Sequence, residues 1–368
     1  MVLTWGNVLA WRLGRQLLDP VGTGSVVDVV ERLGAVPAWP DQALEVGIGV
    51  RRTGGRTGDG TRALEEGEVV KVFAFRGAVH LMTPQDAGAY LVVRASNRQW
   101  ELKSWRDYYR LEPDDWPRFR AYVREALDDG PLTRSELAAA LGRSRRYRHL
   151  REIVAEGNVT LLKPLSWQGD VGLGLPRDGE ETYVRLDRTP GWGGLPDLEE
   201  AGPRVITAYL RTYGPAVPER VHDHVSKSLA APARAVTRWL ADVESRVEHV
   251  DVEGERLLVH PDDLDDLHAT RPSASVRLIP GRDPWVMAPG TTDPHVVPPA
   301  HREVISRTAN PVLHRGVVAG TWAVRRDRLE VDWWPDSGRV PRTALAEESA
   351  ELARFLGREL ELSLTPAA

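Results

Sequence analysis

Cysteine is absent from this chain of 368 residues, and lysine and phenylalanine each occur only four times. Without cysteine the chain has no disulfide scaffold, thiolate nucleophile, iron–sulfur cluster or cysteine-based zinc site. No apolar run approaches the roughly 20 residues that a membrane-spanning helix needs, and no basic segment leads into an apolar one at the N-terminus. We therefore expect a cytoplasmic protein without a membrane partner.

The composition nevertheless supports packed cores. Hydrophobic residues make up 42% and charged residues 27% of the chain, which excludes disorder as the main state, and the length fits two to four domains. A net charge of -5 and a pI near 6.1 argue against binding of nucleic acid through overall positive charge. Any basic surface must therefore be local.

The first part of the chain reads as helices followed by a β-ribbon. Apolar residues at helical spacing predict two helices between Thr4 and Leu33, the second capped by Ser25, and a third over 41–50. Strands are expected over 69–75 and 78–82. This order is typical of a winged helix, and we assign residues 1–105 to the N-terminal helices and a first winged-helix unit.

The same order recurs in residues 106–196, the second predicted unit. A helix over 116–127 is followed by Thr133-Arg134-Ser135-Glu136, a capping box for a helix that ends at Gly142. An arginine-rich helix over 144–156 completes a helix-turn-helix, and strands over 159–164 and 182–186 form its wing.

A third winged-helix unit is predicted over 197–271 and a β-rich domain over 272–368. The third unit has helices over 201–210, 217–225 and 232–243, and a hairpin over 247–260 that turns at Glu253-Gly254-Glu255. The last region has strands over 276–279, 285–287, 317–324 and 329–334 and a closing helix over 342–360. The predicted fold class is α+β, with tandem winged-helix units and a barrel-like C-terminal β-rich domain.

Two groups of residues suggest chemistry from the residues alone. Five arginines fall within nine residues on the predicted second helix of the helix-turn-helix: Arg143, Arg145, Arg146, Arg148 and Arg151. They form either a DNA-binding surface that contacts phosphates or a solvated charged face paired with neighbouring glutamates.

The second group lies at a glycine turn, where Arg76-Gly77-Ala78-Val79-His80 brings an arginine and a histidine together at the start of a strand. The pair is either a site that uses a titrating imidazole or a structural histidine beside a surface arginine. His222 and His224 do not suggest a metal site, because residues two apart point to different sides of a helix. We expect neither a metal nor a cofactor.

Six segments spread over nearly the whole chain form a recognisable series. They are Val8–Leu13, Arg76–Leu81, Leu162–Gly169, Tyr213–Ala216, Val276–Trp285 and Val318–Trp322. In order and spacing the series resembles the winged-helix DNA-binding family that includes the DNA crosslink-repair glycosylases AlkZ and YcaQ. The resemblance marks Arg76 and His80 as part of an RGTxH-like motif, and Asp283, Trp285 and Trp322 as further motif positions.

The resemblance implies tandem winged-helix units around a DNA-binding concavity and a C-terminal β-domain. It also implies excision of alkylated, cationic purines and unhooking of crosslinks without a metal, through a Gln-x-Gln or Gln-x-Asp motif that positions water. The implied partner is double-stranded DNA, alkylated or crosslinked, and the protein would be associated with the nucleoid. Because an N7-alkylated purine is already a good leaving group, an amide that holds water can suffice.

This sequence departs from the family at that motif. The family's polar pair aligns with Pro37 and Trp39, and neither proline nor an indole can orient a water as glutamine does. Three hypotheses follow. Catalysis is lost and the protein binds DNA or a lesion, with Trp39 as a stacking platform; or Asp41, Gln42 or Glu45 replaces the motif in a divergent glycosylase; or the chain is a small-molecule-binding or structural paralogue.

Overall fold

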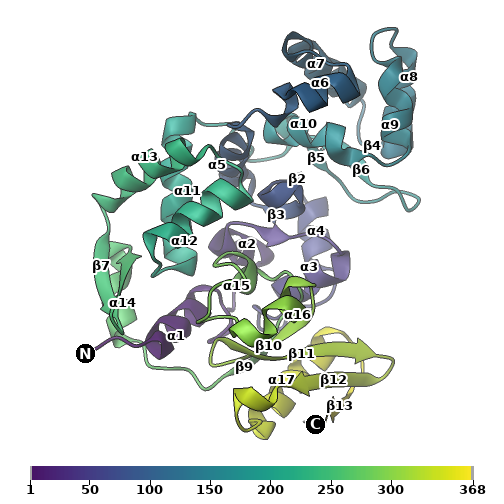
Figure 1. The fold of residues 1–368 in the computed structure, drawn as a ribbon. Helices are drawn as coiled ribbons and strands as arrows, with labels where there is room; N and C mark the ends of the chain where they lie inside the picture. Colours follow the sequence, from purple (N-terminus) through teal and green to yellow (C-terminus); the bar gives the residue numbers. More distant parts are fainter. Residues whose placement is uncertain (1, 366–368) are drawn as a thin grey trace. The chain divides into compact units, whose positions relative to one another are not determined.

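Two units make up the computed structural model, which describes residues 2–365. The terminal unit comprises the described residues up to Gly60, Ile206–His224 and the residues from Arg238 onward. The central unit comprises Thr61–Val205 and Val225–Thr237. Figure 1 labels their helices and strands.

The terminal unit contains α1 (Trp5–Arg15), α2 (Val26–Leu33), β1 (Val36–Pro37), α3 (Asp41–Gly49), α12 (Pro218–Asp223), β7 (Glu248–Val252), β8 (Glu255–Val259), α14 (Leu264–Ala269), β9 (Val276–Leu278), α15 (Pro284–Met287), α16 (Arg302–Ser306), β10 (Asn310–His314), β11 (Val317–Arg325), β12 (Arg328–Trp333), α17 (Arg342–Phe355) and β13 (Glu361–Leu364).

The central unit contains β2 (Val70–Phe73), β3 (Val79–Met82), α5 (Pro84–Ala95), α6 (Lys103–Tyr109), α7 (Trp116–Ala126), β4 (Leu132–Thr133), α8 (Arg134–Arg143), α9 (Arg151–Ala155), α10 (Lys163–Trp167), β5 (Val171–Leu173) and β6 (Thr182–Arg185). The division between the units falls within α4 (Asp59–Glu65), α11 (Leu198–Tyr213) and α13 (Ala233–Glu244).

Side-chain caps set where several helices begin. The Ser25 hydroxyl accepts a hydrogen bond from the backbone N–H of Asp28 at the start of α2, and the Asp28 carboxylate accepts one from the backbone N–H of Ser25. Thr133 and Glu136 form the same reciprocal pair at the start of α8, as the sequence predicts. These local signals explain why the expected helix starts are confirmed.

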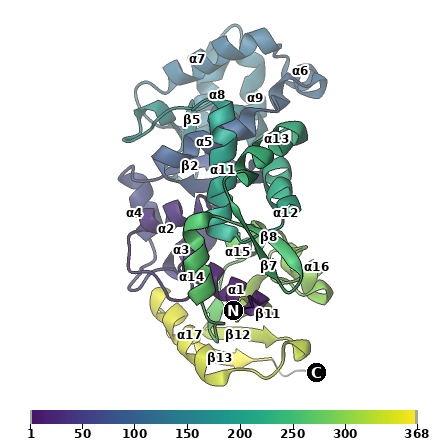
Figure 2. The same cartoon turned by 90° about the vertical axis from the view of Figure 1, so that its left-hand side faces the viewer.

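The C-terminal β-rich part is a curled sheet with strand order β13-β12-β11-β10-β9. Its register changes between Val312 and Leu313, where β10 pairs with β11, and such an irregularity bends a strand. Apolar residues of the sheet, among them Leu278 and Val331, are buried with Leu345 and Leu352 of α17. Figure 2 shows α17 beside these strands. The mixed α+β class with a β-rich C-terminal part is confirmed.

In the central unit, strands follow the order β3-β2-β5-β6-β4. α10 packs against α5, β2 and β5, and the Trp167 side chain on α10 is buried. On α7, Trp116 and Phe119 meet edge to face, with ring centroids 5.6 Å apart. Among residues 2–365, no helix is both long and apolar enough to cross a membrane.

Four local expectations differ from the structure. Residues 159–162 form a 3-10 turn that leads into α10 rather than a strand, because Pro164 fits the first turn of a helix. Trp285 likewise lies on α15, where Pro284 and the capping Asp283 start a helix instead of a strand. α8 continues through Gly142 to Arg143.

The arginine-rich segment is the fourth difference. Residues 144–156 do not form one continuous helix: a 3-10 turn over Arg148–Leu150 precedes the short α9. Leu150 is fully buried and directs this segment into the core of the unit. The predicted recognition helix is therefore two short pieces.

A buried ion pair joins three parts of the terminal unit. The Arg51 guanidinium donates to both carboxylate oxygens of Asp283 at 2.7 and 2.8 Å, and both side chains are 0% exposed. Arg51 also donates to the backbone oxygens of Gln16, after α1, and Gly47, in α3. Asp283 in turn accepts from the backbone N–H of Trp285. Because every charge has a hydrogen-bonded partner, the pair is tolerated in the core.

Removing only the negative charge tests this pair. We expect Asp283→Asn to lower the free energy of unfolding by about 3 kcal/mol, since the near-isosteric amide leaves the Arg51 charge buried without a counter-ion. Urea denaturation measures the change. The matched control is Asp327→Asn in the exposed turn before β12, where we expect a change within about 0.5 kcal/mol. Equal stability of the two variants would contradict the assignment.

Candidate functional site

The end of α2, just before the segment that carries Pro37 and Trp39, is fixed by two side-chain hydrogen bonds from α11. The Tyr213 hydroxyl donates to the backbone oxygen of Leu33 at 2.8 Å, and Thr212 donates to that of Arg32 at 2.9 Å. Ala38 is fully buried between the two aligned positions. The backbone therefore cannot turn a different side chain into the site without opening the core.

Trp39 is 60% exposed, which is unusual for the largest apolar side chain. The Arg282 guanidinium lies over its ring, 5.9 Å from the ring centroid, near the outer limit of a cation–π contact. Pro37 is half-buried in β1 and offers no side-chain donor or acceptor. In place of two polar side chains, the site presents an exposed indole face with a cation above it.

The turn that carries Arg282 is rigid for identifiable reasons. Arg282 has a left-handed backbone, with φ at 65°. The preceding Gly281 donates to Asn310 at 2.7 Å, and a Cβ added there would lie 2.3 Å from the backbone oxygen of Thr308. Only glycine fits this position. Asp283 follows directly, so the buried pair with Arg51 fixes the turn from its other side.

Three residues of α3 are candidates to replace the polar motif, and they differ in how exposed their side chains are. Asp41 and Gln42 are exposed in the first turn of the helix, directly after Trp39 and Pro40. Glu45 is buried, and its carboxylate accepts from the backbone N–H groups of Gly58 and Gly60 at 3.0 and 3.2 Å. Glu45 therefore has a structural role, because its carboxylate binds the backbone at the start of α4.

The structure places Arg76 and His80 in different surroundings. Arg76 is exposed, with a left-handed φ of 53° in the 3-10 turn Phe75–Gly77. His80 is buried: its Nδ1 lies 3.1 Å from the backbone oxygen of Ala78, and its ring packs against Phe75. Burial lowers the pKa of His80 to about 4, so the imidazole is neutral near pH 7.

The five arginines lie on the surface of the central unit. Arg146 forms an ion pair with Asp115, whereas the others form no ion pair among residues 2–365; these are Arg143, Arg145, Arg148 and Arg151. Such side chains can neutralise phosphates, and their role in DNA binding stays a prediction.

The other motif positions lie in the core of the terminal unit. Trp285 and Trp322 are buried, and their indole N–H groups donate to the backbone oxygens of Gly316 and Ile279. The Asp283 carboxylate forms the buried ion pair with Arg51. These motif positions therefore belong to the core of the terminal unit.

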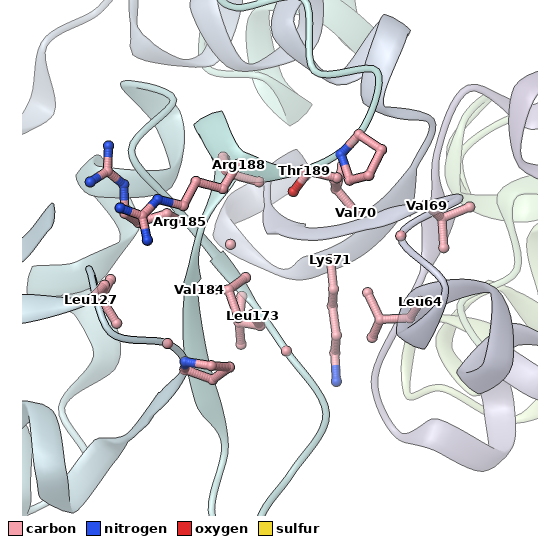
Figure 3. Close-up of a pocket in the computed structure, with 17 residues that line it drawn as sticks. Leu64, Val69, Val70, Lys71, Leu127, Leu173, Val184, Arg185, Arg188 and Thr189 are labelled. Carbon is pink, nitrogen blue, oxygen red and sulfur yellow. The ribbon is translucent and has the colours of Figure 1, made fainter.

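A pocket of about 300 Å³ lies in the central unit (Figure 3). Its walls are mainly apolar, with Leu64, Leu173 and Val184 among them. Arg185 is paired with Asp128 and Asp187, and Figure 3 shows the Lys71 ammonium pointing away from the arginines. The polar groups do not converge on one point, so the pocket lacks the orienting contacts of a small-molecule site.

Residues 2–365 contain no group of three or more histidine, aspartate or glutamate side chains that could hold a metal ion.

Comparison with known proteins identifies the family. A family model described as DNA glycosylase AlkZ-like matches residues 30–355. The chain belongs to this AlkZ-like DNA glycosylase family. It is 33% identical over 363 residues to the interstrand DNA cross-link repair glycosylase of Streptomyces sahachiroi, covering 97% of this chain and 98% of the relative. The solved structure of Streptomyces sahachiroi DNA glycosylase AlkZ matches with a TM-score of 0.92 at 32% identity, covering 99% of this chain and all of that one.

One residue of the candidate site was not predicted from the sequence. Arg282 lies far from Trp39 in sequence, and only the turn signal of Gly281 hinted at a special backbone there. An arginine placed between a required glycine and a buried aspartate is a signal that could have been used. The contact itself depends on how distant segments pack, which the sequence does not specify.

His80 provides a pH test of the central unit. Unfolded histidine has a pKa near 6.5, and burial lowers the pKa of His80 to about 4, so the unfolded chain binds the proton first as the pH falls. The stability due to neutral His80 is present above about pH 6.5 and is lost toward pH 4, amounting to roughly 3 kcal/mol at most. We expect His80→Gln to flatten this part of the curve of unfolding free energy against pH. The control His249→Gln, at an exposed position, should keep the wild-type curve; a wild-type curve for His80→Gln would contradict the prediction.

Proposed function

We propose that this AlkZ-like protein binds duplex DNA that carries an alkylated or crosslinked base, and that it does not release the base through the amide-held water of the Gln-x-Gln motif. The observation that carries the proposal is the exposed Trp39 ring beneath Arg282, at the family's catalytic positions. The proposed setting is the nucleoid, in the cytoplasm. The proposed DNA-binding scaffold is the series of tandem winged-helix units with the domain limits given by the sequence.

The chemistry of the two substitutions supports loss of the amide mechanism. Holding a water for attack on a sugar carbon requires an acceptor for its proton and a group that fixes its orientation. Pro37 supplies neither, and Trp39 has a single N–H donor. Ala38 is fully buried, which keeps this segment in place.

The same substitutions suit base recognition. An exposed indole face stacks on any base, and such a contact contributes about 1–3 kcal/mol in single-stranded nucleic acid complexes. Arg282 adds a planar cation that can stack or contact a phosphate. The site thus combines stacking and positive charge without a hydrolytic group, which fits a protein that holds a lesion.

A divergent glycosylase is the second candidate, and one observation favours it. Asp41 and Gln42 are exposed within three residues of Trp39, at the start of α3. A carboxylate there could orient water or stabilise a sugar cation. Glu45 is less suited, because two backbone N–H groups already occupy its carboxylate.

Binding is tested first at the indole. We expect Trp39→Ala to weaken binding of a duplex with N7-methylguanine by about tenfold, as loss of one stacking contact predicts. Fluorescence anisotropy at constant salt measures the change. Trp39→Phe should retain most of the affinity, and Val304→Ala, an exposed apolar residue of α16, serves as the control. Equal affinity of Trp39→Ala and wild type would rule out the indole as a platform.

Catalysis is tested by rebuilding the motif. We expect wild type to leave N7-methylguanine in place, and the double variant Pro37→Gln, Trp39→Gln to release it, because the rest of the family scaffold is retained. Heating in alkali and measuring strand cleavage detects the abasic site. Cleavage by wild type would overturn the proposal. In that case, loss of cleavage in Asp41→Asn or Gln42→Ala would identify the replacement group.

A further inference from the structure

Two positively charged side chains of the central unit lie close together in largely buried positions. Arg94 on α5 is 4% exposed, and its guanidinium lies 3.8 Å from the ring centroid of Trp167 on α10. Lys163, the first residue of α10, is half-buried, with its ammonium 5.7 Å from the ring centroid of Phe73. The two charges interact, since Arg94 and burial both lower the pKa of Lys163, burial being the larger cause.

These charges lack counter-ions. Arg94 donates from Nη2 to Gln99 at 2.7 Å, but its buried Nε and Nη1 have no hydrogen-bond partner. Within residues 2–365, neither Arg94 nor Lys163 forms an ion pair with a carboxylate. Burial lowers the pKa of Arg94 to about 10. Leaving two like charges and two donors unpaired is unfavourable in the free protein, and a bound anion would remove that cost.

The turn Phe75–Gly77 lies directly beside the ammonium. A Cβ added to Gly77 would be 3.3 Å from the Lys163 Nζ, and Gly77 has a left-handed φ of 67°. The neighbours Arg76 and Ala78 are exposed, so this turn reaches the surface. Two of the sequence segments singled out above, Arg76–Leu81 and Leu162–Gly169, therefore meet at the unpaired charges.

We propose that Arg94 and Lys163, beside the Arg76–Gly77 turn, form a binding site for one phosphodiester group of the DNA backbone. Guanidinium and ammonium groups are the side-chain partners that proteins use for phosphate. A base is a poor occupant, because Trp167 is 1% exposed and Arg94 covers its ring. The site rests on the proposed DNA binding and adds a defined phosphate contact to it.

The test uses the salt dependence of duplex binding by the full chain. Each neutralised phosphate contributes about one unit to the slope of log affinity against log salt, so we expect Lys163→Gln to reduce the slope by about one. Lys163→Arg keeps the charge and should keep the wild-type slope. Lys103→Gln is the matched control, because Lys103 is exposed in the same unit and paired with Asp107. Thermal unfolding of each variant verifies folding.

The outcomes separate this site from the proposed function. A wild-type slope for Lys163→Gln, with intact duplex binding, would overturn the site and leave the proposed function standing. Absence of duplex binding by wild type would overturn both. A parallel arm adds inorganic phosphate: if phosphate raises the melting temperature of wild type but not of Lys163→Gln, while the DNA slope is unchanged, the site takes a free anion and the assignment to DNA is wrong.

Discussion

The buried pair of Arg51 and Asp283 is the interaction on which the proposed base-recognition site depends. One guanidinium ties together the ends of α1 and α3 and the turn before α15. The same turn carries Arg282, and α3 begins just after Trp39. Because both charges are fully buried, the pair persists only with its complete set of hydrogen bonds. The pair therefore fixes the backbone from which the exposed Arg282 side chain reaches the Trp39 ring.

The buried framework and the exposed residues of the candidate site have different roles. The chain aligns with its AlkZ relative over nearly its full length and superposes with a TM-score of 0.92. Its motif positions Asp283, Trp285 and Trp322 are buried structural residues. Pro37 and Trp39, which the sequence resemblance aligns with the family's polar pair, lie at the surface of this scaffold: Trp39 is 60% exposed and Pro37 is half-buried. A shared fold does not by itself determine the chemistry of a site, which depends on the side chains that the site presents.

Local signals made much of the fold predictable. The caps at Ser25 and Thr133 and the alternating strands near the C-terminus identify elements by themselves, because each depends on residues a few positions apart. The errors occur where packing decides: Leu150 breaks the arginine-rich segment, and Pro164 starts a helix in a stretch that looked like a strand. Of the candidate site, the sequence indicated Trp39 and Asp41 but not Arg282, since that contact joins segments about 240 residues apart.

The central unit also contains a buried positive charge at Arg94, which within residues 2–365 lacks the counter-ion that Arg51 has. Arg51 has its counter-ion within the fold, whereas Arg94 has a glutamine amide and an indole face but no carboxylate. A domain that needed Arg94 only for packing could have used an apolar side chain at lower cost. The unpaired donors beside Lys163 are better explained by a ligand that arrives with its own negative charge. Membership in a DNA glycosylase family is the reason for proposing a backbone phosphate as that ligand.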